Sequence, residues 1–87
     1  MSYEIRLTKR VEKEIASLST IDYVRISAAI GSLAANPRPI GARKLKGYDK
    51  DWRIRVGRFR ILYSVEDVVR VIEIYRVTDR KEAYRGL

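Results

Sequence analysis

The chain of 87 residues contains no cysteine and no histidine. Without cysteine it has no disulfides, thiolate nucleophiles or zinc fingers, and without histidine it has no Ser-His-Asp triad and no imidazole acid–base catalyst. Any chemistry must therefore use Arg, Lys, Tyr and carboxylate side chains. We expect neither a metal site nor a bound cofactor.

Long hydrophobic runs are also absent. No stretch approaches the roughly 20 apolar residues that a transmembrane helix requires, and residues 1–10 lack the apolar core of a signal peptide. A chain of this length forms one domain with a modest core, here residues 1–87. These features predict a cytoplasmic protein with a single domain and no membrane association.

Acidic residues are scarce in the middle of the chain. The whole sequence carries 19 Lys and Arg against 11 Asp and Glu, a formal net charge of +8. Residues 38–60 hold nine of the basic side chains and only two of the acidic ones, which gives this segment +7. Such a concentration indicates a polyanionic partner such as nucleic acid or an acidic protein, the alternative being a solvated basic surface. Apolar residues interrupt the charges at strand spacing, so we expect the segment to be structured.

The N-terminal half reads as a strand followed by two helices. Apolar and charged residues alternate over residues 2–7, as in a half-buried strand. Thr8 is placed to cap a first helix and Ser19 a second, and Asn36-Pro37 ends the second because proline disfavours helical geometry before it. Apolar residues recur at helical spacing in both helices, so we expect a helical hairpin that covers a sheet.

A β-hairpin is the clearest local signal. The two-residue connection Gly57-Arg58, with glycine first, predicts a type II′ turn. This turn places Arg55 directly opposite Arg60. The other pairs that it fixes are Val56–Phe59, Ile54–Ile61, Arg53–Leu62 and Trp52–Tyr63. The inward-facing apolar residues of these pairs then share one face of the sheet, and Arg53, Arg55 and Arg60 share the other.

A third strand is predicted over residues 68–77, at the middle of the sheet, after a turn at residues 66 and 67. The expected fold is α+β: an N-terminal strand and a two-helix hairpin packed on a four-stranded antiparallel sheet. Residues 79–84 are expected to form a short C-terminal helical turn.

The predicted arginine face is the main functional clue. Arg55 and Arg60 repel each other when directly opposed, at a cost of a few tenths to ~1 kcal/mol. A phosphate bound between them would replace this repulsion with charge-assisted hydrogen bonds. The alternative is that the arginines extend into solvent or pair with Glu66 or Glu73. The basic residues concentrated at this face are Lys44, Lys46, Arg53, Arg55, Arg58 and Arg60.

Tyr84 is a second clue. It follows Arg80 and Lys81 in a polar tail and has no periodic reason to be buried. It is either a hydrophobic anchor for the tail or an aromatic surface on which an unpaired RNA base stacks.

Five segments together carry a family signal: YEIRLTKRVEKEIASL, AANPRPIGARKLKG, DWRIRVGRFRILYSV, VVRVIEIYRV and DRKEAYR. Over nearly the whole chain the sequence resembles the RelE/ParE toxin superfamily, specifically its RelE branch of mRNA interferases. The resemblance implies a toxin of a type II toxin–antitoxin module that enters the ribosomal A site and cuts the messenger RNA there. It further implies a metal-independent, ribosome-dependent endoribonuclease. The implied partners are the ribosome with A-site mRNA and a RelB-like antitoxin that is acidic or amphipathic.

The resemblance also implies residue roles. The matching positions are Lys44 and Lys46 in the basic loop, Arg53 and Arg55 on the hairpin strand, Arg60 before the I-L-Y stretch, and Arg80 and Tyr84 in the tail motif. In this scheme Arg55 and Arg60 hold the scissile phosphate while the 2′-OH attacks it. Tyr84 deprotonates or orients the 2′-OH, and Arg80, with Lys46 as an alternative, assists the leaving oxygen. Lys44, Lys46 and Arg53 bind RNA, and Arg58 is predicted to do so as well because it belongs to the same concentration of basic residues.

Two other functions fit the same sequence. One is a ParE-like toxin that inhibits DNA gyrase and has no nuclease activity. The other is a non-catalytic basic module that binds RNA or the antitoxin. The intact basic hairpin and the R-K-E-A-Y tail favour the nuclease.

Overall fold

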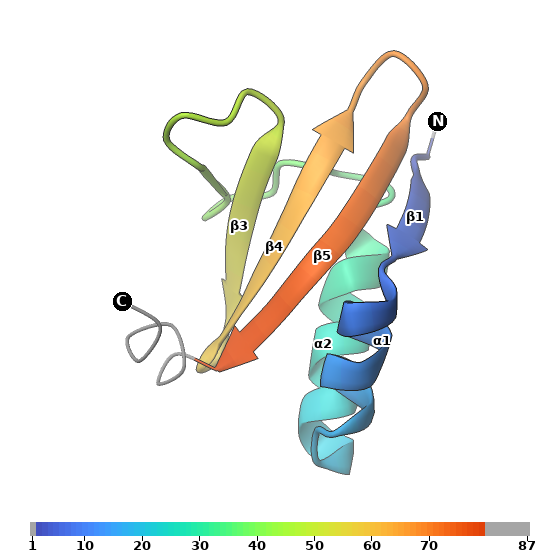
Figure 1. Ribbon diagram of the computed structural model, residues 1–87, viewed down its shortest axis with the longest axis vertical. Coiled ribbons are helices and arrows are strands. Elements are labelled where there is room, and N and C mark those ends of the chain that lie inside the picture. Colours follow the sequence, from blue (N-terminus) through green and yellow to red (C-terminus); the bar gives the residue numbers. More distant parts are fainter. Residues whose placement is uncertain (1, 80–87) are drawn as a thin grey trace.

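Two helices and five strands make up residues 2–79, the part of the chain that the computed structural model describes (Figure 1). The strands are β1 (Glu4–Leu7), β2 (Arg43–Lys44), β3 (Asp51–Val56), β4 (Phe59–Glu66) and β5 (Val71–Asp79), and the helices are α1 (Lys9–Ala16) and α2 (Thr20–Ser32). The predicted α+β class is confirmed. The predicted helical turn of the tail lies outside the described residues, apart from Asp79 at the end of β5.

The sheet is mixed, in the order β1-β5-β4-β3-β2. Strand β1 runs parallel to β5, and the other pairs are antiparallel. The prediction of four antiparallel strands was therefore wrong in strand number and in the direction of β1. A parallel pair needs a long connection, and here both helices and the β2–β4 region lie between the two strands. The prediction that β5 lies inside the sheet is confirmed.

Side-chain caps begin both helices as predicted. The Val11 N–H donates to the Thr8 hydroxyl at 3.2 Å, and the Asp22 N–H donates to the Ser19 hydroxyl at 3.3 Å. Each such cap satisfies a backbone donor that the helix itself leaves unpaired. Helix α2 ends at Ser32, before the predicted stop. Within residues 2–79 no helix is long and apolar enough to cross a membrane.

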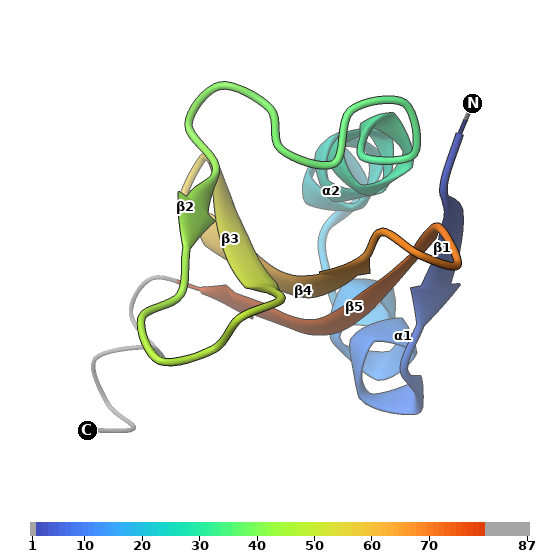
Figure 2. The same cartoon turned by 90° about the horizontal axis from the view of Figure 1, so that it is seen from above.

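One hydrophobic core lies between the helices and one face of the sheet. Figure 2 shows α2 lying over one side of the curved sheet. The side chains buried in the core include Val11 and Ile15 from α1, Ile26 and Ile30 from α2, and Ile54, Ile61, Tyr63, Ile72 and Ile74 from the sheet. Fully burying one such aliphatic side chain contributes about 1.5–3 kcal/mol. The opposite side of β3 and β4 is covered by no described element, and we call this side the open face.

The β3–β4 hairpin has the predicted register. Arg55 pairs with Arg60, and the four further predicted pairs are all present. Gly57 has a φ of 58°, which suits the first position of the predicted turn and favours glycine. The register confirms that Arg53, Arg55 and Arg60 share the face opposite the core.

Strand β5 departs from the prediction at its start and in its middle. It begins at Val71, because residues 67–70 form a turn in which Arg70 has a positive φ of 56°. Opposite β4, Leu62 pairs with Arg76 whereas Tyr63 pairs with Ile74. Tyr75 is therefore an extra residue, a β-bulge that changes which face the side chains beyond it occupy.

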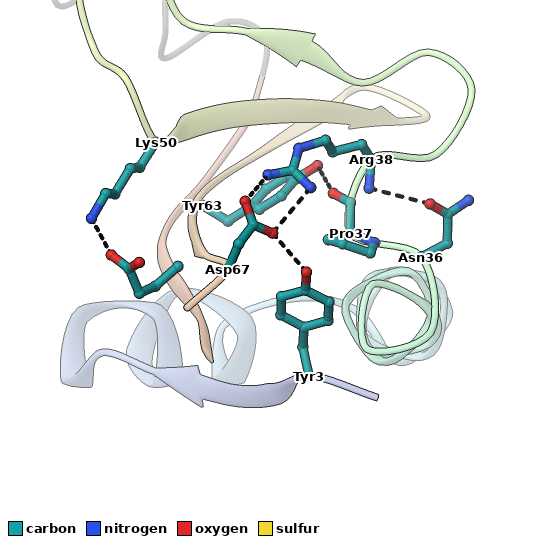
Figure 3. A network of polar contacts seen from close by, with 8 residues as sticks. Tyr3, Asn36, Pro37, Arg38, Lys50, Tyr63 and Asp67 are labelled. Atoms are coloured by element: carbon teal, nitrogen blue, oxygen red, sulfur yellow. Dashed lines mark hydrogen bonds and ion pairs between the residues drawn. The ribbon is translucent and has the colours of Figure 1, made fainter. Parts of the chain in front are cut away.

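A polar network fixes the end of the sheet near the β4–β5 turn (Figure 3). The Asp67 carboxylate accepts hydrogen bonds from the Tyr3 hydroxyl at 2.6 Å and from Arg38 at 2.7 and 3.3 Å. Arg38 also lies 5.3 Å from the ring centroid of Trp52. The buried Tyr63 hydroxyl donates to the Pro37 carbonyl at 2.8 Å. These contacts join β1, the segment after α2, β4 and the turn.

Candidate functional site

Four arginines form one cluster on the open face, and we call Arg43, Arg53, Arg55 and Arg60 the arginine cluster. Strand pairing sets Arg43 opposite Arg53 and Arg55 opposite Arg60, and Arg53 lies two residues from Arg55 on the same strand. Opposing residues of an antiparallel pair point to the same face, with Cβ atoms about 4.5–5.5 Å apart. The fold therefore collects four positive charges from three strands into one place.

Electrostatic repulsion within the cluster is visible at Arg53. Its side chain is half-buried, and the pKa of its guanidinium lies below the ordinary value. The first cause is desolvation, followed by the positive charges of Arg55, Arg60 and Arg43. Both effects disfavour the charged form. Because an arginine keeps its proton at neutral pH, the site holds this charge and favours an incoming anion.

The basic residues of this region fall into two groups by their partners. Arg38 and Lys50 are held by Asp67 and Glu66, as Figure 3 shows for both pairs. Among the basic side chains of residues 38–60, in contrast, five make no ion pair with a described residue: Arg43, Lys44, Lys46, Arg53 and Arg55. The alternative in which Arg53 and Arg55 pair with Glu66 or Glu73 is thus not what the structure has. Their charge stays available to a ligand.

Arg58 lies at the hairpin turn and differs from the cluster in its ion-pair partners. Its guanidinium is 3.1 Å from the Asp79 carboxylate and 3.7 Å from that of Asp22, and it lies 5.2 Å from the ring centroid of Phe59. It therefore joins the hairpin turn to α2 and to the end of β5. The structure thus places this predicted RNA-binding residue beside Arg55 and Arg60, with which it lines a small hollow, but its charge is engaged in ion pairs.

Lys44 and Lys46 lie at the edge of the sheet beyond β3. Lys44 pairs with Trp52 at the end of β2, and Lys46 belongs to the loop that connects β2 to β3. Both line a shallow hollow formed by residues 44–49. Gly47, with a φ of 85°, allows this loop to turn back towards the sheet. Because Lys44 pairs with Trp52, which packs against the core, strand pairing does not place Lys44 among the arginines of the open face. The two lysines add positive charge at the edge of the sheet.

Arg43 is a cluster member that the sequence did not single out. A two-residue strand is too short to show an alternating pattern, so only the register of β2 against β3 places Arg43 opposite Arg53. Two predicted catalytic residues, Arg80 and Tyr84, lie outside the described residues.

A helical hairpin on one face of a small mixed sheet, with a basic open face on the other, defines the class of RelE-like toxins. The chain belongs to the ParE toxin family of type II toxin–antitoxin systems, whose profile matches residues 5–84. It is 32% identical over 89 residues to a protein of Methanocaldococcus jannaschii described as "Putative toxin RelE1", and the match covers 99% of both chains.

Two solved structures support the same family. A chain of the archaeal RelE–RelB complex from Pyrococcus horikoshii OT3 has a TM-score of 0.83 and 30% identity, over 92% of this chain and 97% of that chain. A chain of the RelB–RelE complex from Methanococcus jannaschii has a TM-score of 0.74 and 27% identity, over 94% of this chain and 98% of that chain. The resemblance inferred from sequence is thus confirmed, and the chain is a toxin of the RelE family.

Proposed function

We propose that this toxin is a ribosome-dependent endoribonuclease that cuts messenger RNA in the A site. The observation that carries the proposal is the arginine cluster, in which Arg55 opposes Arg60 on an open sheet face. A phosphodiester is the anion that best matches this arrangement, because guanidinium groups can bind its oxygens in pairs. The ribosome would supply the position of the RNA strand.

The proposed reaction is attack of a 2′-hydroxyl on the adjacent phosphorus. The 2′-O–P bond forms, the bond to the 5′-oxygen breaks, and the products end in a cyclic phosphate and a 5′-hydroxyl. The attacking hydroxyl loses its proton, and the leaving oxygen gains one. Arg55 and Arg60 would stabilise the additional negative charge at phosphorus, an effect worth about 3 kcal/mol for one well-placed donor. Arg53, Arg43, Lys44 and Lys46 would bind the flanking phosphates.

The proton transfers are assigned to the tail, following the family resemblance. Among the described tyrosines, Tyr63 is unsuited to act as a base because it is buried and hydrogen-bonded to Pro37, and burial raises its pKa to about 12. The Tyr3 hydroxyl already donates to Asp67. Following the resemblance, we assign proton transfer from the attacking 2′-hydroxyl to Tyr84 and proton donation to the leaving oxygen to Arg80, with Lys46 as the alternative donor.

The proposed protein partner is a RelB-like antitoxin with acidic and amphipathic segments. The similar archaeal structures named above are complexes of RelE with RelB. An acidic segment would neutralise the arginine cluster. Ile21 and Val24 on α2 are exposed by 72% and 60%, and an amphipathic helix of the antitoxin would cover such residues.

Mapping the 5′ ends of RNA fragments on programmed ribosomes tests this function. The purified toxin should produce cuts within the A-site codon, and the same RNA without ribosomes should be cut far less. A DNA supercoiling assay run beside it tests the ParE-like alternative, which the family profile keeps open. Inhibition of gyrase with intact ribosome-bound RNA would overturn the nuclease proposal.

A further inference from the structure

The open face is not uniformly basic. Next to the arginine cluster, Leu62 on β4 is half-buried and paired with Arg53. Asp51 occupies the same face of β3, opposite Ser64. Beyond them the β-bulge carries Tyr75, which is also half-buried. Leu62 and Tyr75 therefore add apolar and aromatic surface to the open face, beside Arg76, which pairs with Leu62, and Glu73, which pairs with Ser64.

Tyr75 extends towards the β3 side of this surface. Burial raises the pKa of its hydroxyl, and the neighbouring Asp51 carboxylate and Tyr48 hydroxyl raise this pKa further. Asp51 belongs to the open face by its register, and the bulge sets Tyr75 next to Arg76, which pairs with Leu62 of the same face.

Tyr48 is the exposed member of this group. It is 62% exposed, although large aromatic side chains usually have a burial or binding role. Its loop has defined backbone contacts: the Tyr48 N–H donates to the Leu45 carbonyl at 3.3 Å, and the Leu45 N–H donates to the Asp51 carbonyl at 2.9 Å. Figure 2 shows this loop between β2 and β3 bending to the side of the sheet away from α2.

Two lysines lie in the same part of the structure as Tyr48. Lys44 and Lys46 line the same hollow, and Arg53 lies two residues along β3 from Asp51. Aromatic rings interleaved with cations are the usual means of holding single-stranded RNA, because bases stack on the rings while the cations bind the phosphates.

We propose that Tyr48, with Tyr75 and Leu62 as an apolar floor, stacks on an unpaired base of the RNA whose phosphates the arginine cluster holds. This inference rests on the proposed nuclease function and adds a base-binding subsite to it. Arg55 and Asp51 are four residues apart on β3, which is ~13 Å along a strand. The stacked base therefore belongs to a nucleotide that flanks the scissile linkage. Stacking needs the ring and not the hydroxyl, so Tyr48 binds and takes no part in proton transfer.

Cleavage kinetics on programmed ribosomes test the subsite. Tyr48→Ala should raise KM about tenfold and change kcat little, whereas Tyr48→Phe should cleave like the wild type. The matched control is Tyr23→Ala, which removes a 46% exposed tyrosine from α2, on the other side of the molecule. This control should leave both constants unchanged.

A second experiment combines the protein variant with a missing base. Messenger RNAs with an abasic residue at each A-site position in turn are cleaved by the wild type and by Tyr48→Ala. At one position of the A-site codon, removal of the base should raise the KM of the wild type. The KM of Tyr48→Ala, which is already raised, should not change further at that position. Independent, multiplicative effects at every position would overturn the inference, as would unchanged KM in Tyr48→Ala.

The outcomes separate the two proposals. Cutting by the wild type with equal cutting by Tyr48→Ala would refute the subsite and leave the nuclease intact. A wild type that cuts no ribosome-bound RNA would refute both. Weaker antitoxin binding by Tyr48→Ala with unchanged KM would assign Tyr48 to the antitoxin interface and overturn the stacking role.

Discussion

At the β4–β5 end of the sheet, the Arg38 guanidinium binds the Asp67 carboxylate and lies over Trp52, whereas at the β3–β4 hairpin Arg55 lies directly opposite Arg60. Both places draw on the same basic segment of the chain. In the first, opposite charges join separate parts of the fold. In the second, like charges are placed directly opposite each other, which costs stability. Basic residues of one segment, residues 38–60, can therefore be divided by their partners. Those that bind a carboxylate support the fold, and those that face other cations are candidates for binding a ligand.

The largest expected effect is on cleavage. Arg60→Ala should reduce the rate of A-site cleavage about 100-fold, because it removes one donor to the charge that develops at phosphorus. Arg6→Ala serves as the control, since Arg6 lies on edge strand β1 and pairs with Glu4. Thermal unfolding monitored for both variants would show whether each remains folded. A folded Arg60→Ala variant that cleaves at the wild-type rate would contradict the functional role of the Arg55–Arg60 pair.

The next effect is on stability at the structural end. Tyr63→Phe should lower the free energy of unfolding by about 1–2 kcal/mol, because the Pro37 carbonyl loses the hydroxyl that donates to it. Urea denaturation measures this change. Ribosome-dependent cleavage, measured below the unfolding transition, should be unaffected. A cleavage defect with unchanged stability would mean that this end of the sheet is not purely structural.

Acid pH should weaken the same end. Hydrogen bonds from Arg38 and then from Tyr3 hold the pKa of Asp67 below its ordinary value of 3.8. The carboxylate therefore contributes stability that is complete above pH 3.8 and is lost as the pH falls through the lower folded-state pKa. Asp67→Asn should flatten this part of the curve of unfolding free energy against pH. As a control, Asp49→Asn at an exposed position should leave the pH dependence of the unfolding free energy unchanged. An equal change in both variants would contradict the role of Asp67.

The smallest expected effect is on stability at the arginine cluster. Arg55→Gln should stabilise the folded protein by a few tenths of a kcal/mol at low salt, because it relieves repulsion within the arginine cluster. The gain should shrink in high salt as the charges are screened. Denaturation at two salt concentrations tests this. Destabilisation by Arg55→Gln would show that the cluster supports the fold after all.

The sequence was sufficient to predict the register of the β3–β4 hairpin, but not the direction of β1 or the start of β5. A two-residue turn at Gly57 fixes every later pair, so the opposition of Arg55 and Arg60 was predictable. Residue pattern carries no information on whether β1 runs parallel to its neighbour. Val68 was read as part of a strand, yet it lies in a turn and is 89% exposed.

The sequence also could not predict the partners and orientation of several single side chains. Arg58 looks like its neighbours in sequence, but its partners Asp22 and Asp79 lie far away along the chain and meet it only in the folded protein. The bulge at Tyr75 could not be read from alternation, because an inserted residue interrupts that alternation. Tyr23 shares the helical spacing of the apolar residues Ile26 and Ile30 on α2, yet it is 46% exposed.

The most direct test compares two arginines that flank the same turn. Arg55→Ala and Arg58→Ala remove equal charge within three residues of each other, one from the open face and one from the ion pairs with Asp22 and Asp79. The measurement is the rate of A-site cleavage on programmed ribosomes by each purified variant. We predict a loss of about 100-fold for Arg55→Ala and a rate near that of the wild type for Arg58→Ala. Equal rates for the two variants would contradict the claim that the open face binds the scissile phosphate.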